Sequence, residues 1–133
     1  MVRIIGVDYG EKRIGVAASD PLLITAQGVA TVKDLKELKE VIGRYDDVQE
    51  IVVGMPRSMD GTYGIQAQKV LAFIETLKSE TGFNVIAWDE RLTTAAAERM
   101  LISAGVSREK RKKVIDKSAA VGILQSYMDR KKK

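Results

Sequence analysis

Acidic residues at three separated places in the chain could act together as ligands of a divalent metal ion. Asp8 follows one apolar run, and the pair Asp89 and Glu90 follows another. Asp116 lies near the start of the last amphipathic segment. Carboxylates that converge repel one another unless a cation or a shared proton relieves the repulsion. We expect Mg²⁺ or Mn²⁺, because hard divalent ions take oxygen ligands, and a two-metal site could clamp the attacking and leaving oxygens in phosphodiester hydrolysis.

The composition excludes most other kinds of enzyme chemistry. The 133 residues include neither Cys nor His, so Cys-His and Ser-His nucleophile systems and zinc sites built on Cys or His are excluded. An enzyme of this composition depends on carboxylates, Lys, Tyr or a hard metal. No leader segment and no apolar stretch long enough to cross a bilayer is present, and the lack of Cys fits a reducing compartment. We therefore expect one cytoplasmic domain over residues 1–133, without membrane contact.

Positive charge is concentrated in two clusters. The net charge is +4 at pH 7, and one cluster is the C-terminal run 130–133. Such clusters attract phosphate backbones, which makes structured RNA or branched DNA the expected partner. The alternative is a solvated, flexible surface. The second cluster is internal and consists of Arg108, Lys110, Arg111, Lys112 and Lys113.

The hydrophobic pattern predicts an α/β fold with a mixed five-stranded sheet. Three antiparallel strands come first, and the later strands alternate with helices and are therefore parallel, with helices on both faces. The apolar run Ile4–Val7 lacks polar alternation, which indicates a central strand covered on both faces. The further predicted strands are 13–18, 27–32, 50–53 and 83–88, and the predicted helices are 33–43, 65–78, 93–104 and 114–128, with a basic loop before the last helix.

This sheet should bring the acids together. Ligands gather outside the carboxyl ends of the parallel strands, where Asp8 and the pair Asp89 and Glu90 are expected. Asp116 shares the helical register of an apolar stripe that includes Ala120 and Leu124, so it is expected to face the sheet. Two alternatives remain open at this point: Asp8 opens a turn, and Asp116 caps the helix N-terminus.

Four segments of the chain resemble, in order and spacing, the signature blocks of the bacterial YqgF family. The segments are VDYGEKRIGVAASD, IVVGMPRSMDGT, WDERLTT and KVIDKSAAVGILQSY. They span essentially the whole chain. Members of that family are described as pre-16S rRNA nucleases and as Holliday-junction-resolvase-like proteins.

The resemblance implies an RNase H-like fold and a hydrolase, a metal-dependent endonuclease that matures the 5′ end of 16S rRNA on a pre-ribosomal particle. Asp8, Glu90 and Asp116 match the family's three catalytic acids. Asp89 is an alternative metal ligand to Glu90, because a strand end can present either neighbour.

Several basic residues near these blocks are candidates for phosphate contacts. Arg57 could bind a backbone phosphate, and Arg91 could steer a phosphate or simply pair with a neighbouring acid. Lys12 is either part of this surface or ordinary hairpin surface. Trp88 is expected in the core rather than as a stacking platform for bases.

Three other functions compete with an RNA nuclease. The first is a Holliday junction resolvase on branched DNA, which requires a two-fold homodimer to cut symmetric strands, whereas a monomer would favour RNA. The second is a non-catalytic RNA-binding or ribosome-binding module that keeps the acids for folding. The third is a nucleotide-binding relative of the actin and sugar-kinase type, which the short length disfavours because those proteins have two such domains.

Overall fold

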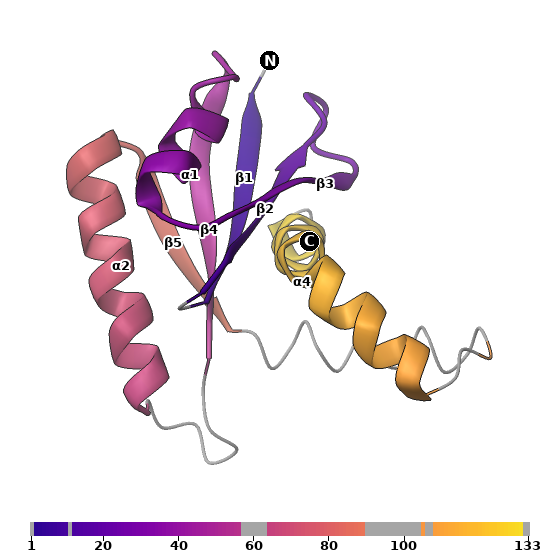
Figure 1. The fold of residues 1–133 in the computed structure, drawn as a ribbon. Helices are drawn as coiled ribbons and strands as arrows, with labels where there is room; N and C mark the ends of the chain where they lie inside the picture. The colour runs from indigo at the N-terminus through magenta and orange to yellow at the C-terminus, as the bar shows by residue number, and fades with distance from the viewer. Residues whose placement is uncertain (1, 11, 57–63, 90–104, 106–107, 132–133) are drawn as a thin grey trace.

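The computed structural model describes residues 2–10, 12–56, 64–89, 105 and 108–131, and within 108–118 it describes the backbone (Figure 1). This part of the chain contains five strands and three helices. In chain order they are β1 (Arg3–Tyr9), β2 (Ile14–Ser19), β3 (Ala26–Val32), α1 (Leu35–Ile42), β4 (Val48–Met55), α2 (Ile65–Thr81), β5 (Asn84–Asp89) and α4 (Arg108–Lys131).

The strands form one mixed sheet in the order β3-β2-β1-β4-β5. The first three strands form an antiparallel meander, and β1 pairs in parallel with β4, which pairs in parallel with β5. The prediction of a mixed five-stranded sheet is therefore confirmed. The carboxyl ends of β1, β4 and β5 lie at one edge of the sheet, as the argument about the acids requires.

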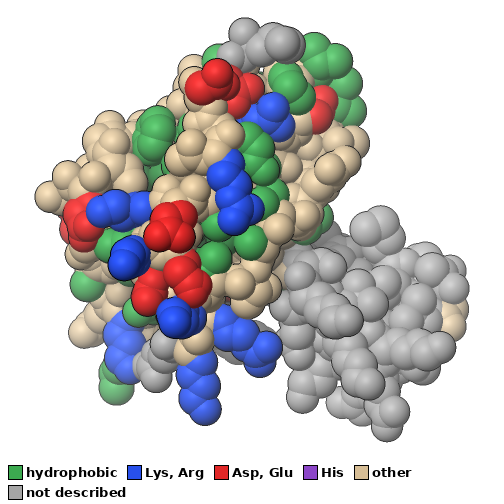
Figure 2. Space-filling model, turned by 45° about the horizontal axis from the view of Figure 1, so that its top comes forward, with side chains coloured by type: hydrophobic (Ala, Val, Ile, Leu, Met, Phe, Trp, Pro, Cys, Tyr) green, Lys and Arg blue, Asp and Glu red, His purple; other side chains and the backbone are tan. Residues whose placement is uncertain are grey.

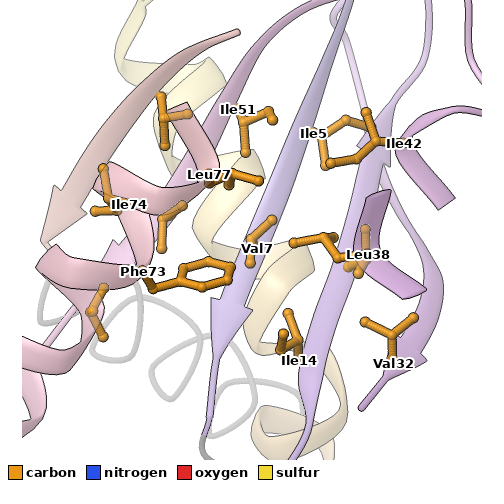
Figure 3. Close-up of a cluster of buried hydrophobic side chains, with 14 of the residues drawn as sticks. Ile5, Val7, Ile14, Val32, Leu38, Ile42, Ile51, Phe73, Ile74 and Leu77 are labelled. Carbon is orange, nitrogen blue, oxygen red and sulfur yellow. The ribbon is translucent and has the colours of Figure 1, made fainter. Parts of the chain in front are cut away.

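Both faces of the sheet are covered. Ile5 and Val7 are fully buried in the core under α1 and α2, which Figure 3 shows, whereas their neighbour Ile4 is fully buried in a second core under α4. Strand alternation explains this division, because successive side chains point to opposite faces. The continuous apolar run that begins the chain thus fills both cores, and the predicted placement of helices on both faces is confirmed.

Local signals in the sequence explain where the first two helices begin and end. The carboxylate of Asp34 accepts a hydrogen bond of 2.9 Å from the Glu37 amide and so caps the N-terminus of α1. Gly82 ends α2 in the left-handed conformation at φ 74°, which glycine adopts without steric cost. These ends agree with the predicted ones to within three residues.

The last helix begins earlier than the sequence pattern predicts. It starts at Arg108, not at Val114, so the expected basic loop is in fact the first turns of α4. Arg, Lys and Glu are good helix formers, and the sequence has no Gly or Pro between Gly105 and Gly122. Asp116 therefore lies inside the helix and is not its N-cap. The predicted helix 93–104 lies outside the described residues.

Candidate active site at the carboxyl end of β1

Asp8 lies near the end of β1 on the face covered by α4. Its neighbours Val7 and Tyr9 belong to the opposite core, where the Tyr9 ring lies 4.4 Å from that of Phe73, centroid to centroid. Asp8 must therefore point to the α4 side. It is half-buried, and no hydrogen bond or ion pair joins its carboxylate to another described residue. Asp8 still lies within β1, in register with Gly15 of β2, so it is a strand residue and does not open the turn.

Helix α4 crosses β1 at very short range because Gly6 has no side chain. A Cβ atom at Gly6 would lie 2.7 Å from the Cβ of Leu124 and 3.0 Å from the carbonyl oxygen of Ala120. A Cβ atom at Gly15, the partner of Asp8 on β2, would lie 3.6 Å from the Cβ of Ala120 and 3.7 Å from the Cβ of Asp8. Ala120 thus lies directly beside the pair formed by Asp8 and Gly15.

The buried side of α4 is a stripe with a spacing of four residues. Ala120, Leu124 and Met128 are 6%, 0% and 2% exposed, and all three belong to the core under α4. From Leu124 to Ala120 the stripe advances along β1 from Gly6 toward Asp8. Asp116 is the next position of the stripe, one helical turn beyond Ala120. Its backbone is helical, and its side chain lies outside the described residues.

Of the two neighbouring acids Asp89 and Glu90, Asp89 is the last residue of β5. Asp89 is in register with Met55, which belongs to the core under α1 and α2. Trp88 is in register with Gly54 and packs against the core under α4. Asp89 therefore lies on the opposite face from Asp8. Glu90 lies outside the described residues.

A polar cluster joins α4 to β4, and the sequence analysis missed it. Glu50 is 6% exposed, and its Oε1 accepts hydrogen bonds from the Tyr127 hydroxyl at 2.8 Å and from Lys131 Nζ at 2.9 Å. Burial, followed by the contact with Glu50, raises the pKa of Tyr127. The hydrogen bond to Glu50 also raises the pKa of Lys131. The signal in the sequence was an acid at the start of an otherwise apolar strand.

The structure describes only some of the basic residues that are candidates for phosphate contacts. Lys12 is exposed beside the turn between β1 and β2, whereas Arg57 and Arg91 lie outside the described residues. The cluster that begins at Arg108 has a described helical backbone, and this half of α4 extends away from the sheet (Figure 1). Figure 2 shows Lys and Arg intermingled with Asp and Glu on the face in view. Acids slightly outnumber bases among the described side chains, so the positive net charge comes from the other segments.

The acidic side chains are the only candidate ligands for a divalent metal, because the sequence has no Cys or His. Among the described residues, no three acidic side chains form a group that could hold an ion. The predicted set combines Asp8 with Glu90 and Asp116, whose side chains are not described. Carboxylates alone, without His or Cys, suit Mg²⁺ or Mn²⁺.

No described helix is long and apolar enough to cross a membrane.

Known proteins match this chain over nearly its full length. The family model described as "RuvX: Holliday junction resolvase" matches residues 2–130. A protein of Desulforamulus reducens named "Putative pre-16S rRNA nuclease" is 54% identical, and the match covers 96% of this chain and 97% of that protein. A protein of Clostridioides difficile with the same name is 55% identical, with 96% and 94% of the two chains covered.

Solved structures of resolvases share the fold. Thermus thermophilus RuvC in complex with a Holliday junction substrate superposes with a TM-score of 0.59 at 15% identity and covers 98% of this chain and 96% of its own. The fowlpox virus resolvase with Holliday junction DNA gives a TM-score of 0.51 at 16% identity, covering 99% of this chain and 100% of its own. The predicted RNase H-like fold is therefore confirmed.

Proposed function

This chain belongs to the RuvX family of Holliday junction resolvases, and from that premise we propose that it is a metal-dependent endonuclease that trims the 5′ end of precursor 16S rRNA in the cytoplasm. The RNA substrate is taken from the name that the relatives in D. reducens and C. difficile carry. Branched DNA is the second candidate substrate, because the likeness to resolvases extends over almost the whole chain.

The observation that carries the proposal is the close passage of α4 over β1. Ala120 lies beside Asp8 and Gly15, and Gly6 leaves no room between the helix and the strand. Asp116 is one helical turn, about 6 Å, beyond Ala120 along α4. We propose that these two acids, Asp8 and Asp116, which are separated by more than a hundred residues in the chain, share one ion.

Strand alternation favours Glu90 over Asp89 as the third acid of the site. Asp89 lies on the α2 side of the sheet, whereas Asp8 lies on the α4 side. Successive side chains of a strand point to opposite faces, so a residue that continued β5 beyond Asp89 would face the α4 side. We therefore assign the metal-binding role to Asp8, Glu90 and Asp116.

In this proposal the acidic residues would hold the metal ion, and the basic residues would bind the nucleic acid. A bound divalent ion would supply a nucleophile from water and stabilise the charge that develops on the phosphodiester. The three carboxylates would hold it in place. The basic start of α4, with Lys12, Arg57 and Arg91, would bind the backbone phosphates on either side of the scissile bond.

The proposal is tested by cleavage of a precursor 16S RNA that carries its 5′ leader, with Mg²⁺ or Mn²⁺. The wild type should cut it, and Asp8→Asn and Asp116→Asn should lose at least 100-fold in rate. Asp129→Asn is the matched control, because it neutralises an acid on the same helix that accepts a hydrogen bond from Gln125, away from the site. Equal cleavage by the wild type and Asp8→Asn would reject the proposal.

The same preparation should be offered a four-way DNA junction. Faster cleavage of the RNA supports the rRNA assignment, and faster cleavage of the junction transfers the proposal to branched DNA. A non-catalytic RNA-binding module predicts a third result, in which the wild type binds the RNA and cuts neither substrate.

A further inference from the structure

We propose that the turn between β2 and β3 is a docking surface for a second copy of this chain. Two exposed apolar side chains of the turn, Leu22 and Ile24, form a knob, and a hollow lies directly beside them. In the dimer, the knob of each copy enters the hollow of the other. This inference goes beyond the proposed nuclease and does not depend on it.

The knob exposes more apolar surface than a turn needs. Leu22 is 70% exposed and Ile24 is 53% exposed. Leu23, which lies between them, packs instead against the core under α4. Large apolar side chains gain free energy when they leave water, so two of them on one turn indicate a surface that is covered by a partner.

The turn holds the knob in one conformation. The Asp20 carboxylate accepts hydrogen bonds from three backbone amides of the turn, those of Leu22 at 3.3 Å, Ile24 at 2.7 Å and Thr25 at 2.8 Å. Leu23 has a left-handed backbone with φ 59°, which residues other than glycine rarely adopt. A surface that already has its bound shape loses less conformational entropy on association.

A hollow of about 400 Å³ adjoins the knob. It begins at Pro21, the residue before the knob, and Gln27 and Val29 of β3 line it as well. Arg3 also lines it, and the Arg3 guanidinium lies 4.9 Å from the centre of the Tyr45 ring. Val29 packs against the core under α1 and α2, so the hollow opens on that side of the sheet.

A projection and a hollow side by side fit a second copy of the same surface. A two-fold axis between them places each knob over the hollow of the partner, because a two-fold interface uses the same patch on both copies. Residues 21–32 contain no charged side chain, and Arg3 is paired with Asp47 at 3.0 Å. The surface therefore has little attraction for a phosphate backbone, and two copies can meet on it without repulsion.

This surface lies at the far end of the sheet from Asp8. The turn follows Ser19, whose Oγ accepts a hydrogen bond of 2.8 Å from the amide of Ile4 near the start of β1. Figure 1 shows the turn at the end of the sheet where the chain begins. Asp8 is about 13 Å further along β1 than Ile4. Dimer formation should therefore leave both candidate active sites accessible.

The test is sedimentation equilibrium of the full chain at about 1–500 µM. The wild type should form a reversible dimer with a micromolar dissociation constant, as expected for a small interface. The double variant Leu22→Ser, Ile24→Ser should raise that constant at least about 100-fold, and because both side chains are exposed, it should still fold. The control is Leu71→Ser on α2, which removes an apolar side chain that is 43% exposed and should dimerise as the wild type does.

A mixing experiment tests whether the knob enters the hollow. Gln27→Trp should fill the hollow and weaken the dimer of that variant as well. Each variant alone has both knob-to-hollow contacts damaged. A mixed dimer of the knob variant and Gln27→Trp keeps one contact in which both sides are wild type. The mixture should therefore form more dimer than either variant alone.

Any of four results would overturn the inference. They are a wild type that stays monomeric at every concentration, a knob variant that dimerises like the wild type, an equal loss of dimer in Leu71→Ser, and a mixture that dimerises no better than its components. The measurement needs neither a metal ion nor a nucleic acid. Its failure would leave the proposed nuclease untouched, and a failure of RNA cleavage would leave the dimer untouched.

Discussion

Adding one methyl group at Gly6 should force α4 away from β1 and disturb the proposed site without changing any acid. The Cβ atom of alanine would lie 2.7 Å from the Cβ of Leu124 and 3.0 Å from the carbonyl oxygen of Ala120. Atoms this close cannot be separated by a side-chain rotation, because both belong to the helix backbone or are bonded to it. Since carbon atoms in contact lie about 3.5 to 4.0 Å apart, the helix must move by roughly 1 Å.

The cost of that movement follows from known effects of overpacking. Filling an already packed core costs about 1–3 kcal/mol. Replacing a glycine in a strand by alanine offsets up to about 1 kcal/mol of this loss of stability, because alanine has less conformational freedom in the unfolded chain. Gly6→Ala should therefore lose about 1–2 kcal/mol of stability, or roughly 3–10 °C in melting temperature for a domain of this length.

Thermal unfolding and Mn²⁺-dependent cleavage measure the two consequences. Gly28→Ala is the control, because its Cβ atom would meet Val121 Cγ2 at an ordinary 3.7 Å. It should match or exceed wild-type stability and keep wild-type cleavage. A Gly6→Ala protein with wild-type melting temperature and wild-type cleavage would refute the claim that close passage of α4 builds the site.

Two further predictions concern contacts away from the acids. Glu50→Ala should cost about 1–3 kcal/mol of stability, because the Tyr127 hydroxyl loses its buried acceptor. Glu75→Ala should change stability by less than about 0.5 kcal/mol, because the ion pair between Glu75 and Lys78 is exposed. Urea unfolding measures both, and equal losses would contradict the stabilising role of the buried Glu50 contact. Hydrogen bonds from the amides of Thr25, then Ile24 and Leu22, lower the pKa of the Asp20 carboxyl. Its stabilising effect is thus present above the unfolded pKa of about 3.9 and disappears as the pH falls through the lower folded pKa. The melting temperature of the wild type should exceed that of Asp20→Asn at pH 6, and the gap should close below about pH 4; a gap that does not change with pH would contradict this.

The sequence predicted the sheet well because its signals are local. The run Ile4–Val7 is apolar without alternation and lies in a strand buried on both faces. The start of α4 was predicted wrongly because Arg108 and the basic residues that follow have no apolar periodicity. Their helical propensity was the only signal available, and it was outweighed by the expectation that charged runs form loops.

Contacts between distant segments could not be predicted from the sequence. Glu50 and Tyr127 are 77 positions apart, and no periodicity links a strand residue to a particular residue on a helix. The choice between Asp89 and Glu90 stayed open for a related reason. Choosing between these acids requires knowing which face of the sheet each residue of β5 occupies. For Asp89 the structure shows this through its register with Met55, which the sequence does not reveal.

The central proposal is that Asp8, Glu90 and Asp116 hold the same divalent ions. Calorimetric titration with Mn²⁺ tests it most directly, applied to the wild type, Asp8→Asn, Glu90→Gln, Asp116→Asn and the control Asp129→Asn. We predict that each of the first three variants binds Mn²⁺ at least tenfold more weakly than the wild type and that the control binds equally well. Wild-type Mn²⁺ affinity in Asp116→Asn would contradict the account.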